Sequence, residues 1–144
     1  MRTLALLAFL VAPLAPGVAP GAASGSPSVT CQVPHDAHQR EYRLNRDGKV
    51  WTLSMRGTNT DGRWVSLPLP DAAPVFTGGT ASLSYRSAYG GRTIALQVSP
   101  AVASLDVYAN YELEVNVDPN LNPQVDLLNT GGPLTGLTCQ VANP

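Results

Sequence analysis

The sequence predicts one small all-β domain, an antiparallel β-sandwich or β-barrel of about eight to ten short strands. Apolar residues alternate with polar ones along most of the chain, and turn residues separate the alternating runs. No run with helical periodicity is long enough for a helix of about three turns. Short strands joined by tight turns occur in both sandwiches and small barrels, so the sequence leaves these two architectures open.

The strongest strand signals are runs in which every second residue is apolar. Such alternation indicates a strand with one buried face and one face in water. The clearest runs are residues 49–55, 82–86, 92–98 and 111–117, and weaker candidates are residues 41–46, 64–69, 104–108 and 124–128.

The run at 111–117 is predicted to turn Leu113 and Val115 toward the core. The same alternation directs Glu112 and Glu114 toward solvent, on one face of the strand. Ala109-Asn110, just before the run, is expected to form a turn or a bulge.

Turn residues separate the predicted strands. Asp47-Gly48 predicts a tight hairpin, and residues 58–62 and 89–91 predict further reversals. The stretch 67–76 contains several prolines, which cannot donate a backbone hydrogen bond, so it is expected to be extended but not central in a sheet. Residues 100–104 are expected to form a single helical turn.

The N-terminus has the composition of a secretory signal peptide over residues 1–23. A basic Met1-Arg2 precedes an apolar run and then a stretch of small residues, with cleavage expected after Ala23 or, as an alternative, after Gly25. The apolar run is shorter than the roughly 20 residues that span a bilayer. We therefore expect residues 24–144 to form a single domain that is secreted or periplasmic, with no insertion in the membrane.

The charge of the chain is close to neutral, because nine Lys and Arg residues stand against ten Asp and Glu residues. General affinity for nucleic acid or anionic membranes needs a basic surface, so the composition argues against both partners. We expect a monomer whose partner, if it has one, is a protein or a small ligand.

Two cysteines lie near the two ends of the predicted domain. Cys31 and Cys139 each stand in the tetrapeptide Thr-Cys-Gln-Val, and each shares a strand face with apolar neighbours. An even pair of cysteines in an exported protein favours a disulfide, here between neighbouring terminal strands. A zinc site is the alternative, and it needs more ligands than this pair supplies.

Two segments offer weak metal-binding patterns. His35-Asp36-Ala37-His38 places two imidazoles and a carboxylate close together, but a solvated loop explains it equally simply. Further along, Asp118, Asn120 and Asn122 have the oxygen-ligand spacing of a calcium loop. That pattern continues without the glycine and glutamate that such loops use, so a proline-stiffened turn is the competing interpretation, and no cofactor other than calcium is suggested.

Three loop residues are candidates for ligand contact. Trp64 follows a Gly-containing turn, and Tyr89 and Arg92 flank Gly90-Gly91. Aromatic and arginine side chains on loops are typical of binding surfaces, although they also occur at ordinary hairpin ends.

These observations favour a non-catalytic binding module, in the manner of a small protein inhibitor. One alternative is an accessory subunit of a cell-envelope assembly that pairs through an edge strand. The other is a small hydrolase, which requires a pocket that gathers several of His35, His38, Glu112, Glu114 and Asp118.

Overall fold

The computed structural model describes residues 26–119 and 123–142, and it consists of two antiparallel five-stranded sheets. Sheet A runs in the order β10-β1-β2-β3-β4. Its strands, in chain order, are β1 (Ser28–Gln32), β2 (Glu41–Asp47), β3 (Val50–Arg56), β4 (Val65–Leu69) and β10 (Thr138–Ala142).

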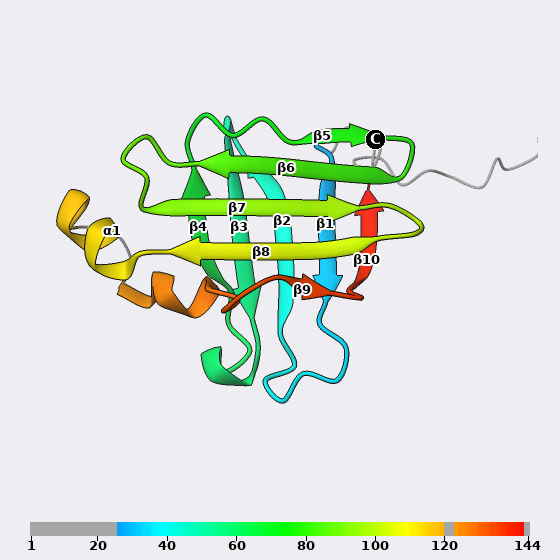
Figure 1. The fold of residues 1–144 in the computed structure, drawn as a ribbon, viewed down its shortest axis with the longest axis horizontal. Coiled ribbons are helices and arrows are strands. Elements are labelled where there is room, and N and C mark those ends of the chain that lie inside the picture. The colour runs from blue at the N-terminus through cyan, green and yellow to red at the C-terminus, as the bar shows by residue number, and fades with distance from the viewer. Residues whose placement is uncertain (1–25, 120–122, 143–144) are drawn as a thin grey trace, which may run out of the picture.

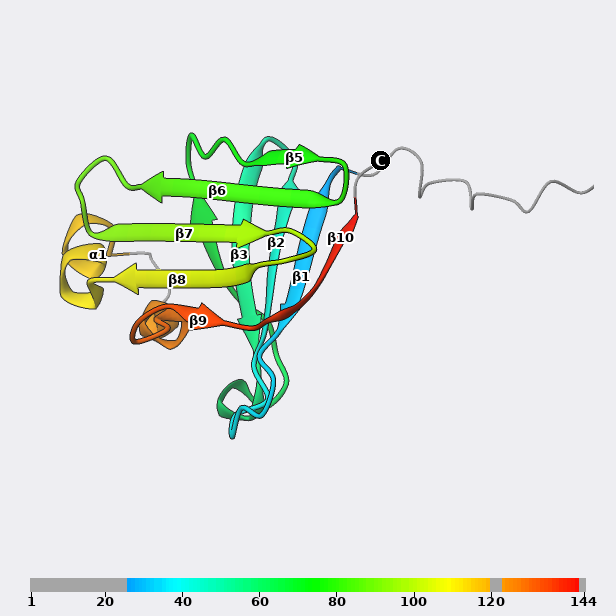
Figure 2. The same ribbon diagram turned by 45° about the vertical axis from the view of Figure 1, so that its right-hand side comes forward.

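Sheet B runs in the order β5-β6-β7-β8-β9. The two sheets lie face to face, and the strands of one run across the strands of the other (Figures 1 and 2). The predicted all-β class is confirmed, and the architecture is a sandwich. The strands of sheet B are β5 (Val75–Thr77), β6 (Thr80–Arg86), β7 (Arg92–Val98), β8 (Ala103–Ala109) and β9 (Leu134–Thr135).

The chain builds each sheet as a meander and then returns to its beginning. The first four strands complete most of sheet A, the next five form sheet B, and β10 comes back to pair with β1. Cys31 and Cys139 stand opposite each other in that last pair and form the predicted disulfide. The bond joins the first and last strands of the domain.

The core lies between the sheets and is supplied by the inward residue of each alternating pair. Ile94, Leu96 and Val98 of β7 are buried while the residues between them are exposed. The same alternation holds for most of β2, β4 and β6. The period of two in the sequence therefore identifies the core face correctly along these strands.

Predicted turns and edges also match the structure. The β2–β3 hairpin turns at Gly48, whose φ of 60° is a conformation that glycine adopts without steric cost. The proline-rich stretch supplies β4 and β5, which stand at the edges of their sheets. The helical turn predicted at residues 100–104 is wrong, because the chain only bends there before β8 begins at Ala103.

The strand predicted at 111–117 is instead the helix α1 (Tyr111–Val117). Asn110 caps it, since its side chain accepts a hydrogen bond from the Leu113 amide at 3.1 Å. Successive residues of a helix are turned by about 100°, so Glu112 and Glu114 no longer share a face. Glu112 is exposed, as predicted, whereas Glu114 is completely buried, which corrects its predicted place in solvent.

Two short 3₁₀ helices complete the structure. The helix η1 (Thr58–Thr60) lies in the β3–β4 connection, within the predicted turn at 58–62. The helix η2 (Pro123–Leu128) replaces the weak strand predicted at 124–128, because Val125 and Leu128 enter the core together. In Figure 1, α1 and η2 lie together at one end of the sandwich.

Asn129 covers part of the edge of β8 beyond the short strand β9. Its side-chain amide donates to the Ala109 carbonyl at 3.0 Å and accepts from the Ala109 amide. The side chain thus makes the two hydrogen bonds that a neighbouring strand would make.

Across the residues that the structure describes, every helix falls short of the length and hydropathy needed to cross a bilayer.

Candidate functional site

A cleft of about 540 Å³ opens at the end of the sandwich that carries α1. Its walls are the β4–β5 connection, the end of β6 with the β6–β7 loop, and the last residues of α1. Ligand pockets commonly have volumes of about 300–1,000 Å³ and mainly apolar walls. Most lining side chains are apolar or aromatic: Pro68, Pro70, Ala72, Ala73, Tyr85, Ala88, Tyr89 and Val117, with Asp71, Ser84, Arg86, Ser87, Arg92 and Asp118 as the polar members.

A buried ion pair lies behind the wall of this cleft, and only one of its members, Arg92, is a lining residue. Nη2 of Arg92 lies 2.5 Å from Oε2 of Glu114, and Nε lies 3.1 Å from Oε1. The two side chains are 4% and 0% exposed. Burial is the largest single influence and lowers the pKa of Arg92, but the hydrogen bonds and charge of Glu114, with smaller contributions from Tyr89 and Tyr85, together leave the pKa above its usual value. The guanidinium therefore stays charged.

The ion pair also joins the two sheets to the helix. Arg92 belongs to β7, Glu114 to α1, and a third donor of Arg92 bonds the carbonyl of Pro68 in β4. The hydroxyl of Tyr89 donates to Glu114 as well. Burial, followed by this hydrogen bond, raises the pKa of Tyr89, so the phenol remains a donor at neutral pH.

Gly91 allows the β6–β7 loop to pack closely against Leu113 of α1, because it has no side chain. A Cβ on Gly91 would lie 2.9 Å from a ring carbon of Tyr89 and 3.0 Å from a methyl carbon of Leu113. Any larger residue would push the tyrosine or the helix aside. The Gly91 carbonyl accepts a hydrogen bond from the Asn110 amide at 2.7 Å, which fixes the start of the helix beside the loop.

The structure brings together two of the three predicted contact residues. Tyr89 and Arg92 both line the cleft, whereas Trp64 is not among its lining residues and lies on the outer side of sheet A. Glu114 completes the cluster, and the alternating pattern had assigned it to solvent. Asn110 followed by two glutamates is an N-terminal helix pattern, and this sequence signal could have separated Glu114 from the face of Glu112, although it does not indicate burial.

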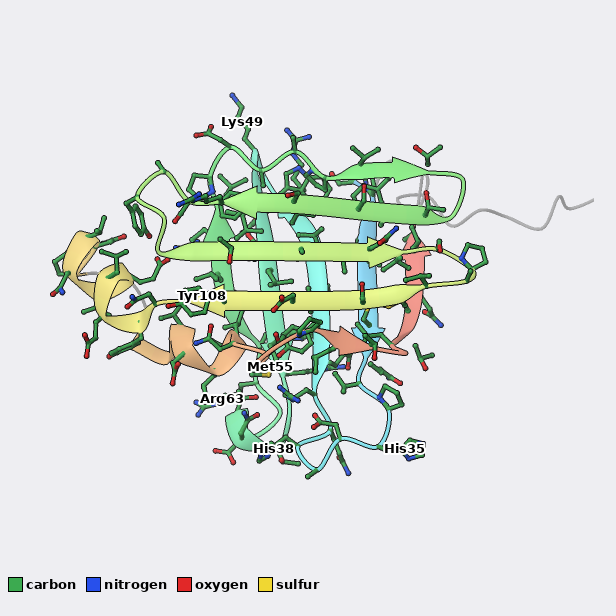
Figure 3. The ribbon with its side chains drawn as sticks, in the orientation of Figure 1. His35, His38, Lys49, Met55, Arg63 and Tyr108 are labelled. Atoms are coloured by element: carbon green, nitrogen blue, oxygen red, sulfur yellow. A yellow bond between two sulfur atoms is a disulfide. The ribbon has the colours of Figure 1, made fainter. Side chains whose placement is uncertain are left out.

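The candidate metal and hydrolase residues lie in two separate places, the histidines between β1 and β2, and Glu112, Glu114 and Asp118 on or directly after α1. His35 and His38 are exposed on the β1–β2 loop (Figure 3), and Asp36 between them binds the Arg40 side chain at 2.8 Å. Asp118 follows α1, and its proposed calcium partners Asn120 and Asn122 lie outside the described residues. Within residues 26–119 and 123–142, no three His, Cys, Asp or Glu side chains gather in a way that could hold a metal ion.

Comparison with known proteins adds no relative, since no protein-family model, curated protein or solved structure matches the chain.

Proposed function

We propose that this protein is a non-catalytic binding module, and that its cleft receives an apolar group of a protein or small-molecule partner. The observation that carries the proposal is the cleft of about 540 Å³ between the β4–β5 connection and the β6–β7 loop. Tyr85 and Tyr89 supply aromatic surface inside it, while Asp71 and Arg86 are exposed polar groups among its lining. An apolar wall with a few polar groups is the common composition of a ligand site.

The hydrogen bonds behind the wall of the cleft support a binding role. Arg92, Glu114 and Tyr89 hydrogen-bond one another, so the loop, the helix and both sheets hold a common geometry. A preformed site loses little conformational entropy when it binds its ligand. These hydrogen bonds also occupy the carboxylate of Glu114, which counts against its use as a general acid or base in the hydrolase alternative.

The edges of the sheets bear on the alternative of an envelope subunit that pairs through a strand. Pro68 lies within the edge strand β4, and β5 and β9 have three and two residues. Asn129 occupies part of the neighbouring β8 edge. Three of the four edge strands in the described sheets are therefore short or contain proline and offer few backbone groups to another strand, which favours the binding module over this alternative, while the fourth, β10, has five residues and no proline.

The proposal includes export from the cytoplasm, with residues 1–23 as the signal peptide. The disulfide between Cys31 and Cys139 supports this location, since disulfides persist in oxidising compartments. N-terminal sequencing of the protein from the producing cells should begin at Ser24, or at Ser26 if cleavage follows Gly25. An intact Met1 on the oxidised protein would contradict it.

The binding proposal is tested by blocking the cleft. Ala88 is exposed in the cleft lining, so Ala88→Trp should fill the site without disturbing the core. The oxidised protein is used to capture partners from extracts and media of its producing cells. Ala101→Trp is the matched control, because Ala101 is exposed on the β7–β8 loop and is not in the lining.

A partner or ligand that binds the native protein and the Ala101→Trp variant, but not the Ala88→Trp variant, supports the proposal. Capture that is equal for all three proteins, or capture of nothing by a folded monomer, would count against the cleft as a binding site.

A further inference from the structure

A second surface, separate from the cleft, lies on the outer face of sheet A. Strand register places Arg43 beside Ser54 and Ser54 beside Ser66, so their side chains share one row across β2, β3 and β4. Glu41 and Arg56 pair in the adjacent row. The Trp64 ring reaches this face from the residue before β4. We call this the Trp64 face: Glu41, Arg43, Ser54, Arg56, Trp64 and Ser66.

Two guanidinium groups stack on the single indole of this face. Cζ of Arg43 is 4.2 Å from the Trp64 ring centroid, and Cζ of Arg56 is 4.5 Å from it. Ser54 leaves room for this arrangement because it is small, and at 1% exposure it is covered although it points outward. Its hydroxyl bonds that of Ser66 at 2.9 Å.

The two arginines differ in how their charge is balanced. Arg56 pairs with Glu41 at 3.0 Å. Among the described residues Arg43 has no carboxylate partner, and its buried Nε has no hydrogen bond. Both guanidinium carbons lie near one ring centroid, so they are within about 9 Å of each other, less than the screening length of about 10 Å at 0.1 M salt. The face therefore carries an uncompensated positive charge.

The distribution of charged residues along the chain adds to the positive charge of this face. Residues 26–69, which include β1 to β4, contain six Lys and Arg and four Asp and Glu. Residues 70–142, which include all of sheet B, contain two basic and six acidic residues. A near-neutral protein thus has a basic half and an acidic half. Such a distribution steers an anionic partner toward sheet A.

We propose that the Trp64 face binds carboxylates on an acidic segment of a partner protein, with Arg43 as the principal contact. The Nε of Arg43 is buried, so the contact is made by its terminal nitrogens Nη1 and Nη2, whose shared planar edge matches a carboxylate in two parallel hydrogen bonds. The indole already contacts two guanidinium groups, so it is a poor platform for stacking a sugar. Trp and Arg together are the residues most enriched at the centres of protein interfaces.

The test measures binding of an octaglutamate peptide to the mature oxidised protein, residues 24–144. The chain has two tryptophans, so a Trp51→Phe background leaves Trp64 as the only indole and makes its emission a local reporter. Addition of the peptide should change Trp64 emission with saturation, and added salt should weaken the affinity. Ala88→Trp, assayed by calorimetry, should bind octaglutamate normally, so failure of the cleft proposal would not affect this result.

Charge-matched variants identify the contact. Arg43→Gln should weaken binding by about fivefold to tenfold, the effect of losing a charge-assisted hydrogen-bonded pair. Lys49→Gln removes the same charge at the β2–β3 hairpin, which lies at the opposite end of the molecule from Arg63, the neighbour of Trp64 (Figure 3). The affinity of the Lys49→Gln variant for octaglutamate should change by less than about twofold, as expected for a remote exposed charge.

Arg43→Lys keeps the charge but loses the planar edge, so a folded Lys variant should bind more weakly than the native protein. The far-ultraviolet spectrum of each variant checks its fold. Equal losses of affinity for octaglutamate in Arg43→Gln and Lys49→Gln would overturn the proposal. An unchanged Trp64 emission at millimolar peptide would overturn it as well. Tighter binding of a heparin fragment of equal charge would also overturn it, in favour of a sulfated glycan.

Discussion

Arg92 of β7 and Glu114 of α1 form an ion pair with an N–O distance of 2.5 Å, although both side chains are excluded from solvent. Each charge is tolerated in the interior because the other neutralises it and neighbouring groups complete its hydrogen bonds. The pair thereby attaches the helix to sheet B and reaches β4 of sheet A. Its removal should affect both the stability of the domain and the wall of the cleft.

Glu114→Ala should lower the free energy of unfolding by about 3–5 kcal/mol, because it leaves the buried guanidinium of Arg92 without a counter-charge. Denaturant unfolding measures this loss. Glu112→Ala is the matched control on the exposed side of α1 and should change stability by about 0.5 kcal/mol or less. The double replacement Arg92→Met with Glu114→Leu should recover part of the loss, and similar small effects in all variants would contradict the role of the pair.

Replacing Cys31 and Cys139 together by Ala should lower the free energy of unfolding by about 4–5 kcal/mol. The disulfide closes a loop with a sequence separation of 108 residues, and a crosslink over about 100 residues restricts the unfolded chain by that amount in the chain-entropy model. Unfolding of the oxidised protein and of the variant in denaturant gives the difference. Equal midpoints would show that the crosslink adds no stability.

Asp36→Asn should destabilise the β1–β2 loop at neutral pH. It should also change how the free energy of unfolding depends on pH in the acidic range. The Arg40 side chain holds the pKa of Asp36 below its usual value of 3.8 through hydrogen bonds at 2.8 and 3.3 Å. A carboxyl with a lowered folded pKa stabilises the protein above about pH 4, and this contribution is lost as the pH falls through the folded pKa.

The free energy of unfolding of the native protein should therefore be higher than that of the Asp36→Asn variant by about 1–2 kcal/mol at pH 7, and this difference should become smaller below pH 4. Unfolding measurements across this range test the expectation. Asp61→Asn is a suitable control, because this exposed aspartate forms no ion pair within the described part of the chain. Parallel profiles for the native and Asp36→Asn proteins would contradict the assignment.

Asn129→Ala should expose the edge of β8 and lower stability by about 1–3 kcal/mol, because both backbone groups of Ala109 lose their partner. Hydrogen exchange at the Ala109 amide should accelerate. Asn116→Ala, at an exposed position of α1, should leave that amide protected. If exchange at Ala109 were unchanged in the Asn129 variant, the strand-like role of this side chain would be wrong.

The strands of this fold follow from the sequence because their alternation has a direct cause. In β7 each inward side chain enters a core that excludes water, so Ile94, Leu96 and Val98 must be apolar and their neighbours need not be. The disulfide follows for a similar reason, since Cys31 and Cys139 occupy core-facing positions in strands at the two ends of the domain. These features depend on local pattern and on composition.

The helix α1 shows where such reasoning fails. Residues 111–117 alternate as a strand does, yet the Asn110 cap and a partner 22 residues away favour the helix. The alternating pattern does not indicate that Glu114 is buried, because its burial depends on the ion pair with Arg92 in the core. The candidate site was therefore predicted only in part: Tyr89 and Arg92 were identified from loop composition, whereas Glu114 depends on a tertiary contact and Trp64 belongs to another face.

The pairing of β1 with β10 has a consequence for biosynthesis. Most strands of this protein find their partner in an adjacent hairpin and have it available as soon as both strands leave the ribosome. The outer side of β1 is different, because its partner β10 is the last of the described strands. A nascent domain that ends before Thr138 presents that bare edge to other chains, and the crosslink that secures it can form only after β10 has paired with β1.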